Sequence, residues 1–382
     1  MKVLHVISAM HHGGAQQMLC DLLPALKCEG IDAELLVFRE LHNSLEQRLI
    51  NDGIRIHSLN LPERSPAVWK AFRSFMKSHS DIDVVHVHLF PALYQVAISM
   101  GRNEIPLVYT EHSVSNGRRL LPWGRGIERW IYGHYSRVIA VSDNVKESLS
   151  EWLATGITGP GAYSERDSGK NSGRKSNFIQ VIENGIDLNR FHPKERKDSV
   201  VAPKILMAAR FADAKDHHTL LKSFSMLRNR EAELWLAGDG PKIDEVKAYA
   251  DRLGVKDRCR FLGHVNDIER VIEKVDIGVL SSHWEGYSIS VAECMAGGLP
   301  MVGSDISGIR VVGGDAMEYF PAGDEKKLCE ILHRLMSDRE YYNRHSISSL
   351  SRSKELSITN TAFRYNRLYT TLRDSGESGR SV

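Results

Sequence analysis

Short apolar runs alternate along the chain with longer stretches in which apolar residues recur every three to four positions. Continuous apolar runs are typical of strands buried on both faces, and the longer period is typical of amphipathic helices. The pattern predicts strands at 2–7, 33–38, 54–59, 84–88, 108–112, 138–141, 179–182, 204–209, 234–237 and 275–280. It predicts helices at 15–28, 44–51, 67–77, 143–153, 289–296, 325–338 and 358–372.

Repeated strand-helix units predict parallel sheets, so the fold class is α/β. We expect an N-terminal domain over 1–198, with a mobile surface loop at about 155–176, where glycine, serine and charged residues prevail. A polar linker at 192–203 leads to a second domain over 199–354. The segment 355–382 should form a helix that crosses back to the first domain, followed by a disordered tail from Arg373.

Three further features of the sequence refine this prediction. Pro24 should kink the first helix or end it early. The apolar run before His11 is too short for a signal peptide and is better interpreted as the first strand. No run approaches the length of a membrane span, which is about 18 apolar residues.

Composition and charge exclude some function classes. The 382 residues are 42% hydrophobic and carry a formal net charge of +2, which argues against bulk binding to nucleic acid. The five cysteines are scattered without metal-ligand spacing, as expected of free thiols in a reducing cytoplasm.

The stretch 281–305, SSHWEGYSISVAECMAGGLPMVGSD, is the most informative part of the chain. A buried strand leads into a loop that carries Glu285, and Ser288 is a candidate N-cap for a helix that Gly297 and Gly298 close. Glu293 lies on the face of this helix that should be packed. A loop carboxylate, a helix N-terminus and an inward carboxylate suit a ligand with an anionic centre and hydroxyl-rich ends, such as a nucleotide sugar.

Other polar residues follow the carboxyl ends of predicted strands, where open α/β sheets bind ligands. Gly13 and Gly14 form a turn before the first helix, although two glycines alone are a weak signal for phosphate binding. His112 ends the 108–112 strand. Arg210 and Lys215 follow the first strand of the second domain and are suited to neutralising a diphosphate.

These motifs resemble glycosyltransferase family 4, whose members are retaining enzymes of the GT-B fold, with two Rossmann-like domains that face a central cleft. The resemblance implies that the N-terminal domain binds the acceptor and the C-terminal domain binds the nucleotide sugar. The resemblance is carried by Glu285 and Glu293 at their spacing, by the Met295–Pro300 run, by Asn184-Gly185-Ile186-Asp187 and by Gly238 in its Gly-Asp-Gly-Pro turn. Where family members often carry a glutamate after a Gly-Ile pair, this chain has Arg310. That departure puts in doubt any donor contact from this turn.

The resemblance implies roles for particular residues. His112, Glu285, Arg210 and Lys215 would be the catalytic set, in which the two cations stabilise the leaving diphosphate and Glu285 and His112 bind the sugar. Glu293 would accept hydrogen bonds from the ribose. The other expected donor contacts are Gly13, Gly14, Gly238, Tyr287, Ser288 and Ile289.

The family implies no metal and no cofactor. The Asp81-Ile82-Asp83 sequence has the form of a metal-binding D-x-D motif, but it enters a strand, and we interpret it as a solvated strand edge.

A stretch at 116–137 combines Arg118, Arg119, Arg125, Arg129 and Arg137 with Trp123 and Trp130. It suits either an anionic membrane surface or a solvated helix whose tryptophans pack inward.

We therefore predict a glycosyltransferase that moves a sugar from a nucleotide-sugar donor, first of all a UDP-sugar, to an acceptor such as a lipid-linked saccharide. By analogy, its role would be in lipopolysaccharide, O-antigen or exopolysaccharide assembly. We expect a cytoplasmic protein, peripheral on the inner face of the membrane if the 116–137 stretch binds lipid, and no nucleic-acid partner. Two alternatives stay open: a nucleotide-sugar epimerase or hydrolase on the same fold, and a non-catalytic binding subunit.

Overall fold

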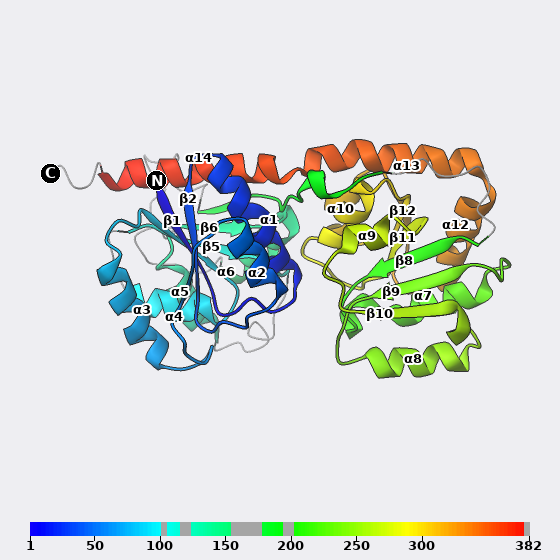
Figure 1. The fold of residues 1–382 in the computed structure, drawn as a ribbon, viewed down its shortest axis with the longest axis horizontal. Helices are drawn as coiled ribbons and strands as arrows, with labels where there is room; N and C mark the ends of the chain where they lie inside the picture. Colours follow the sequence, from blue (N-terminus) through cyan, green and yellow to red (C-terminus); the bar gives the residue numbers. More distant parts are fainter. Residues whose placement is uncertain (101–104, 115–123, 154–177, 194–201, 378–382) are drawn as a thin grey trace. The chain divides into compact units, whose positions relative to one another are not determined.

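The chain folds as two α/β units, each built on a parallel sheet. The computed structural model describes the chain except residues 101–104, 115–123, 154–177, 194–201 and 378–382 (Figure 1). Unit 1 comprises residues 1–185 and the segment that begins at Ile358, and unit 2 comprises Ile186–Ser357. This division describes packing, and the assignment of acceptor binding to the first domain stays a prediction.

Unit 1 contains, in its described residues, a seven-stranded parallel sheet of order β3-β2-β1-β4-β5-β6-β7. The strands are β1 (Lys2–Ile7), β2 (Asp32–Val37), β3 (Ile56–Ser58), β4 (Val84–His88), β5 (Leu107–Glu111), β6 (Arg137–Ala140) and β7 (Ile179–Val181). The helices are α1 (Gly14–Cys28), α2 (Ser44–Asn51), α3 (Ala67–Ser78), α4 (Ala92–Met100), α5 (Gly124–Tyr132), α6 (Asp143–Leu153) and α14 (Ile358–Glu377).

Unit 2 contains a six-stranded parallel sheet of order β10-β9-β8-β11-β12-β13 in the part that the structure describes. The strands are β8 (Lys204–Ala208), β9 (Glu233–Ala237), β10 (Cys259–Gly263), β11 (Ile277–Leu280), β12 (Met301–Ser304) and β13 (Glu318–Phe320). The helices are α7 (His217–Met226), α8 (Ile243–Arg252), α9 (Ile268–Ile272), α10 (Ile289–Ala296), α11 (Ser307–Gly313), α12 (Glu325–Ser337) and α13 (Arg339–Ser353). Short 3-10 turns lie at Leu188–Arg190, Asp213–Lys215, Lys256–Arg258 and Lys354–Leu356.

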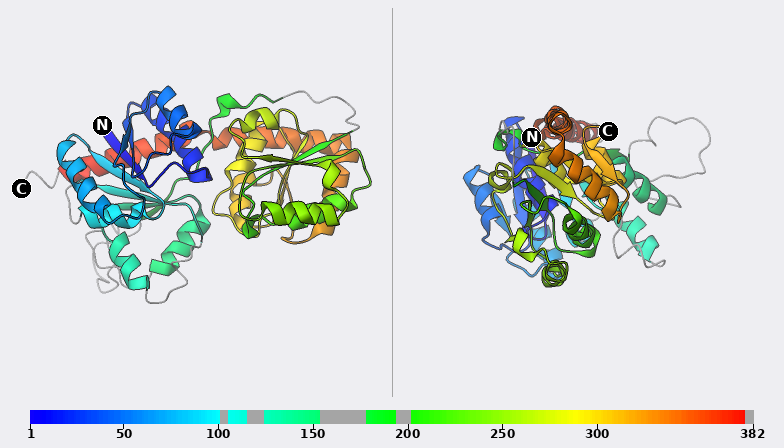
Figure 2. Two further views of the ribbon diagram at one scale, coloured as in Figure 1. Left: turned by 60° about the horizontal axis from the view of Figure 1, so that its bottom comes forward. Right: turned by 90° about the vertical axis from the view of Figure 1, so that its right-hand side faces the viewer.

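Helices cover both faces of each sheet (Figures 1 and 2), and the buried strands are nearly all apolar. The prediction of two parallel-sheet α/β domains is therefore confirmed. In both units the strand order reverses beside the first strand, between β1 and β4 and between β8 and β11. Such switch points are where doubly wound sheets bind ligands.

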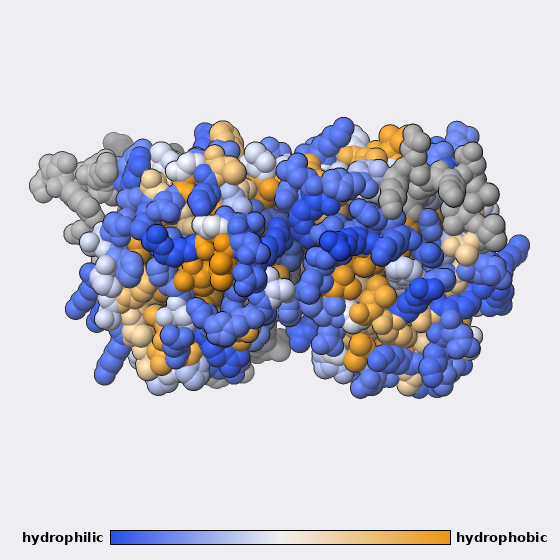
Figure 3. All heavy atoms as spheres, in the orientation of Figure 1, coloured by the Kyte–Doolittle hydropathy of each residue, from blue (hydrophilic) through white to orange (hydrophobic). Residues whose placement is uncertain are grey.

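Along the strands of the unit 1 sheet, successive side chains point to opposite faces. Leu4 and Val6 of β1 and Tyr109 of β5 belong to one apolar core, which they share with helices α3 to α6. Their neighbours in sequence, His5 and Thr110, point to the opposite face, where α14 supplies Tyr365 and Tyr369. In the view of Figure 3 the surface of each unit is mostly hydrophilic.

Two expectations concern helix ends. Of the two effects expected of Pro24, a kink or an early end, the early end is wrong. Helix α1 does not end at Pro24 but runs on to Cys28. The buried face of α1 includes Leu22, Leu23 and Leu26, and this packing offsets the missing backbone hydrogen bond.

The second expectation was disorder from Arg373 onward, but α14 extends to Glu377. The buried side chain of Leu372 and the hydrogen bond from the Ser375 hydroxyl to the carbonyl of Thr371 hold the last turns together. The remaining residues, 378–382, lie outside the described residues, as does the predicted mobile loop at 155–176.

None of the described helices combines the length and the apolar composition that crossing a membrane requires.

Candidate functional site

An ion pair joins the two loops that flank the switch point of unit 2. Lys215 lies in the 3-10 turn after β8, and Glu285 lies in the loop between β11 and α10. The Nζ atom of Lys215 donates to Oε1 of Glu285, and the two side chains are 23% and 11% exposed. The structure thus brings together two residues that the sequence predicted for one site from positions 70 residues apart.

Three consecutive residues hold this pair in place: two of them fasten the loops to each other, and the third holds Glu285 within its own loop. The buried hydroxyl of Ser281 donates to the carbonyl of Asp216 at 2.8 Å and to that of Lys215 at 3.1 Å. The Ser282 hydroxyl donates to Oε1 of Glu285 at 2.9 Å. The backbone N–H of His283 donates to the carbonyl of Ala214 at 2.8 Å. The position of the ion pair therefore follows from a network that is buried or half-buried.

Sequence reasoning missed the parts that Ser281 and Ser282 play. Both hydroxyls are fully buried at the end of an apolar strand, where a polar side chain needs a hydrogen-bond partner. Two adjacent serines at that place were the signal that could have pointed to them.

Glycines allow close approach of the backbone around this network. A Cβ atom on Gly238, whose φ is +142°, would lie 2.1 Å from the carbonyl oxygen of Ala209, next to Arg210. A Cβ atom on Gly308 would lie 2.2 Å from the carbonyl oxygen of Glu285. Gly238 thus supports the loop that carries Arg210, and Gly308 supports the backbone of Glu285.

Arg210 is exposed, and no hydrogen bond or ion pair holds its guanidinium among the residues that the structure describes. A free guanidinium beside the switch point can accept an anionic ligand without first breaking a contact. Arg310, which replaces the family's glutamate, pairs with Asp305 and lies 4.2 Å over the ring of Tyr319. It therefore has a local structural role.

Helix α10 begins close to Glu285 and offers backbone donors. Its N-cap is Ser288, as predicted, but no side chain caps the helix and no acidic residue lies in its first turn. The first N–H groups of a helix have no intrahelical partners, and the helix dipole favours an anion there. Glu293 is buried on the packed face of the helix, and Tyr287 and Ile289 flank the cap.

A pocket of about 300 Å³ opens in unit 2 beside this network. Its lining includes Asp213, Asp216, Lys242, His283 and Trp284. The ring of Trp284 is 59% exposed. An aromatic ring among charged side chains suits a hydroxyl-rich ligand.

In unit 1 the predicted residues lie after β1 and β5. Gly13 is the extended N-cap of α1 and Gly14 is its first residue, and no side chain caps this helix either. His112 follows β5, and its buried Nε2 atom has no hydrogen-bond partner within the described parts of the chain. Burial lowers the pKa of His112 to about 4, so its ring is neutral near pH 7 and can donate or accept a hydrogen bond.

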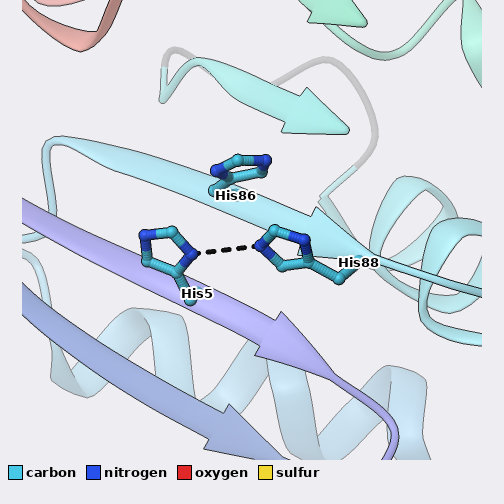
Figure 4. A group of neighbouring side chains, drawn as sticks. All are labelled: His5, His86 and His88. Carbon is cyan, nitrogen blue, oxygen red and sulfur yellow. Dashed lines mark hydrogen bonds between the residues drawn. The ribbon is translucent and has the colours of Figure 1, made fainter. Parts of the chain in front are cut away.

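A cluster of three fully buried histidines lies at the switch point of unit 1 (Figure 4). His5 of β1 is the register partner of His86 of β4, and His88 follows on the same face of β4. Their nearest nitrogen atoms lie within 4.8 Å of one another, as in a metal site. The sequence analysis did not single out this cluster.

The geometry of the cluster fits a hydrogen-bonded network better than a metal site. Nδ1 of His86 lies 2.6 Å from the Tyr369 hydroxyl and Nε2 lies 2.7 Å from the Thr110 hydroxyl, so both of its nitrogen atoms have partners. The ring centroids of His86 and His88 are 4.2 Å apart. Two imidazoles on one tetrahedral zinc ion hold their centroids roughly 5 Å apart, given a Zn–N distance of about 2.0–2.1 Å.

The carboxylates of the D-x-D sequence join the amino ends of the neighbouring strands β4 and β1. Asp83 accepts a hydrogen bond from the backbone N–H of Lys2 at 2.7 Å, and Asp81 accepts one from the Lys2 ammonium group at 2.7 Å. Their contacts are structural.

The described part of the 116–137 stretch divides into structural and exposed residues. Arg125 donates to the carbonyls of Glu151 and Trp152 at the end of α6. Ile127 and Trp130 of α5 are 49% and 57% exposed, so Trp130 does not pack inward. Arg118, Arg119 and Trp123 lie outside the described residues.

The buried histidines make the stability of the fold depend on pH. Burial lowers the pKa of His5 to about 3 and, together with the neighbouring rings, lowers those of His86 and His88 well below the ordinary value. The unfolded chain therefore binds more protons below about pH 6.5, and stability falls as the pH falls from there toward the folded pKa values. Each such group contributes a slope of up to about 1.4 kcal/mol per pH unit.

Thermal melting of the protein and of His86→Gln between pH 7.5 and 5 tests this. The glutamine keeps hydrogen-bonding capacity and removes one titrating group, so the melting temperature should depend less on pH. His333→Gln, on an exposed site, should match the unaltered protein. Equal pH dependence in His86→Gln and the unaltered protein would contradict the assignment.

Comparisons with known proteins match both parts of the chain to glycosyltransferases. The family model described as "Glycosyltransferase Family 4" matches residues 12–157, and the model described as "Glycosyl transferases group 1" matches residues 202–338. The chain is 24% identical over 317 residues to the putative glycosyltransferase EpsF of Bacillus subtilis, covering 80% of this chain and 79% of EpsF.

A shorter alignment links the chain to a protein of lipopolysaccharide synthesis. It is 29% identical over 145 residues to the lipopolysaccharide core biosynthesis glycosyltransferase LpsE of Rhizobium meliloti, covering 37% of this chain and 42% of LpsE. Among solved structures, Anabaena HepE in complex with UDP and glucose superposes with a TM-score of 0.80. That match covers 97% of this chain and all of HepE, at 17% sequence identity.

Proposed function

The chain belongs to glycosyltransferase family 4, has the GT-B fold and transfers a sugar, and we propose that its donor is a UDP-sugar whose anomeric configuration is retained. Structures of HepE contain UDP, UDP-glucose, or UDP with glucose, which supports this class of donor. The observation that carries the proposal is the Lys215–Glu285 pair at the switch point of unit 2.

We assign the charges of the site to the parts of the donor. Arg210 and Lys215 neutralise the diphosphate, helped by the uncapped N-terminus of α10, because charge develops there as the bond to the sugar breaks. Glu285 binds the sugar hydroxyls and Glu293 the ribose. Gly238, Tyr287, Ser288 and Ile289 complete the donor contacts of unit 2, and Gly13, Gly14 and His112 are donor contacts from unit 1.

The reaction needs no protein nucleophile if the acceptor attacks from the side that the diphosphate leaves. The bond between C1 of the sugar and the phosphate oxygen breaks while the acceptor oxygen bonds to C1. The acceptor proton passes to the departing diphosphate. Configuration at C1 is then retained, and the two cations stabilise the charge on the leaving group without a metal ion.

The acceptor that we propose is a lipid-linked saccharide of surface-polysaccharide assembly, at the cytoplasmic face of the membrane. The similarity to LpsE, a glycosyltransferase of lipopolysaccharide core biosynthesis, supports a role in surface-polysaccharide assembly. The exposed side chains of Ile127 and Trp130 on α5 would contact an anionic lipid surface.

Donor-dependent hydrolysis tests the transferase site. The purified protein is incubated with UDP-, GDP- and dTDP-sugars, and the released nucleoside diphosphate is measured without acceptor. We expect slow release from a UDP-sugar. Arg210→Ala or Lys215→Ala should each lower the rate on the order of a hundredfold, because each removes a charge that stabilises the leaving group. Lys256→Ala, in an exposed turn of the same unit, is the control.

Three outcomes separate the alternatives. Release that survives both substitutions would contradict the roles given to Arg210 and Lys215. Conversion of the sugar to an isomer would favour an epimerase. Absence of both release and binding across the panel would favour a non-catalytic subunit.

The stereochemistry and the metal requirement can be measured on the same hydrolysis. Proton NMR of the first released sugar should show the anomer of the donor before mutarotation, and EDTA should leave the rate unchanged, because the two cations replace a metal ion. An inverted product, or loss of activity restored by Mg²⁺ or Mn²⁺, would overturn the corresponding part of the proposal.

Binding to lipid vesicles tests the surface of α5. The double variant Ile127→Ser/Trp130→Ser should sediment less with phosphatidylglycerol vesicles than the unaltered protein does, because it loses exposed apolar area. Phe363→Ser on α14, which is 52% exposed, is the control. Equal sedimentation of all three proteins would remove α5 from the lipid contact.

A further inference from the structure

The carboxylate of Glu285 is held through one of its two oxygen atoms. Lys215 and Ser282 both donate to Oε1. Within the described residues, no hydrogen bond reaches Oε2. An ionised carboxylate has room for about four hydrogen bonds, so Oε2 is left to accept from a ligand.

The backbone of Glu285 is fixed as firmly as its side chain. Gly308 of α11 lies so close that a Cβ atom there would meet both the carbonyl carbon and the Cβ atom of Glu285, at 2.5 and 2.7 Å. On the other side, Ser281 and His283 tie the same loop to residues 214–216. The side chain of Glu285 therefore starts from a set position, and its hydrogen bonds decide where the two oxygen atoms point.

The two donors to Oε1 differ in how firmly they stay there. The Lys215 ammonium ends a flexible side chain that is 23% exposed, and a diphosphate would compete for it. The Ser282 hydroxyl is fully buried and has a single side-chain torsion that positions the oxygen. When Lys215 turns toward a phosphate, Ser282 is the donor that stays on Oε1.

We propose that Ser282 is a positioning residue that keeps Oε1 of Glu285 turned inward and Oε2 turned toward the hydroxyl groups of the donor sugar. This inference rests on the proposed function. Ser282 acts on the sugar half of the donor, because its hydroxyl hydrogen-bonds to Glu285, the residue assigned to the sugar. Its removal should therefore affect binding of a UDP-sugar and leave binding of UDP unchanged.

Calorimetry on the full chain tests the proposal. The ligands are UDP and whichever of UDP-glucose, UDP-galactose and UDP-N-acetylglucosamine binds most tightly to the unaltered protein. Ser282→Ala should weaken the UDP-sugar about tenfold, as expected for loss of one hydrogen bond to a charged group. The affinity for UDP should change less than about twofold, which is within the scatter of small structural effects. Ser225→Ala, at a half-buried serine of α7 away from Glu285, is the control.

A double-mutant cycle with Glu285→Ala separates positioning from general loss of structure. If Ser282 acts through Glu285, then Ser282→Ala has no further effect on the UDP-sugar in the Glu285→Ala background. A loss of equal size in both backgrounds, an equal loss of UDP affinity, or no loss at all would overturn the proposal. A failure of the unaltered protein to bind either UDP or any UDP-sugar would instead overturn the donor site itself, and the proposal with it.

Discussion

The ion pair between Lys215 and Glu285 is the interaction on which the geometry of unit 2 around its switch point depends. It joins loops that follow β8 and β11, the two strands between which the sheet reverses its order. Neither charge is buried alone, and the carboxylate receives a second hydrogen bond from Ser282. Because partly buried charges are tolerated only when they are paired, the pair keeps a charged site in place before any ligand arrives.

The switch point of unit 1 is built from different chemistry. Neutral imidazoles and hydroxyls take the place of the ion pair there, and both ring nitrogen atoms of His86 hydrogen-bond to hydroxyl groups. Such a network depends on the helix that covers it, since Tyr365 and Tyr369 both come from α14. The two units thus use the same sheet order to hold a charged and an uncharged set of side chains.

The amino-acid sequence predicted much of this arrangement. The apolar runs located most of the strands, and the spacing of Glu285 and Glu293 indicated one carboxylate in a loop and one on the packed face of α10. The apolar pattern predicted helix α1 as far as Cys28, whereas Pro24 taken alone indicated an earlier end, and burial of the helix outweighs the local effect of one proline. The histidine cluster escaped notice because His5 and His86 are 81 positions apart and become neighbours only through strand register. The contact between Gly308 and Glu285 was not predicted either. A hydrophobic pattern does not indicate which glycine allows two backbone segments to approach closely.

The place of α14 in the chain has a consequence for how the protein is made. The strands of unit 1 leave the ribosome before unit 2, yet the helix that covers their histidines leaves it after unit 2. Until residues 358–377 emerge, His86 lacks its tyrosine partner and part of the sheet has no cover. All of unit 2 has been synthesised by then. During vectorial synthesis unit 2 can therefore complete its core first, and unit 1 waits with an open face for helix α14, which follows unit 2 in the chain.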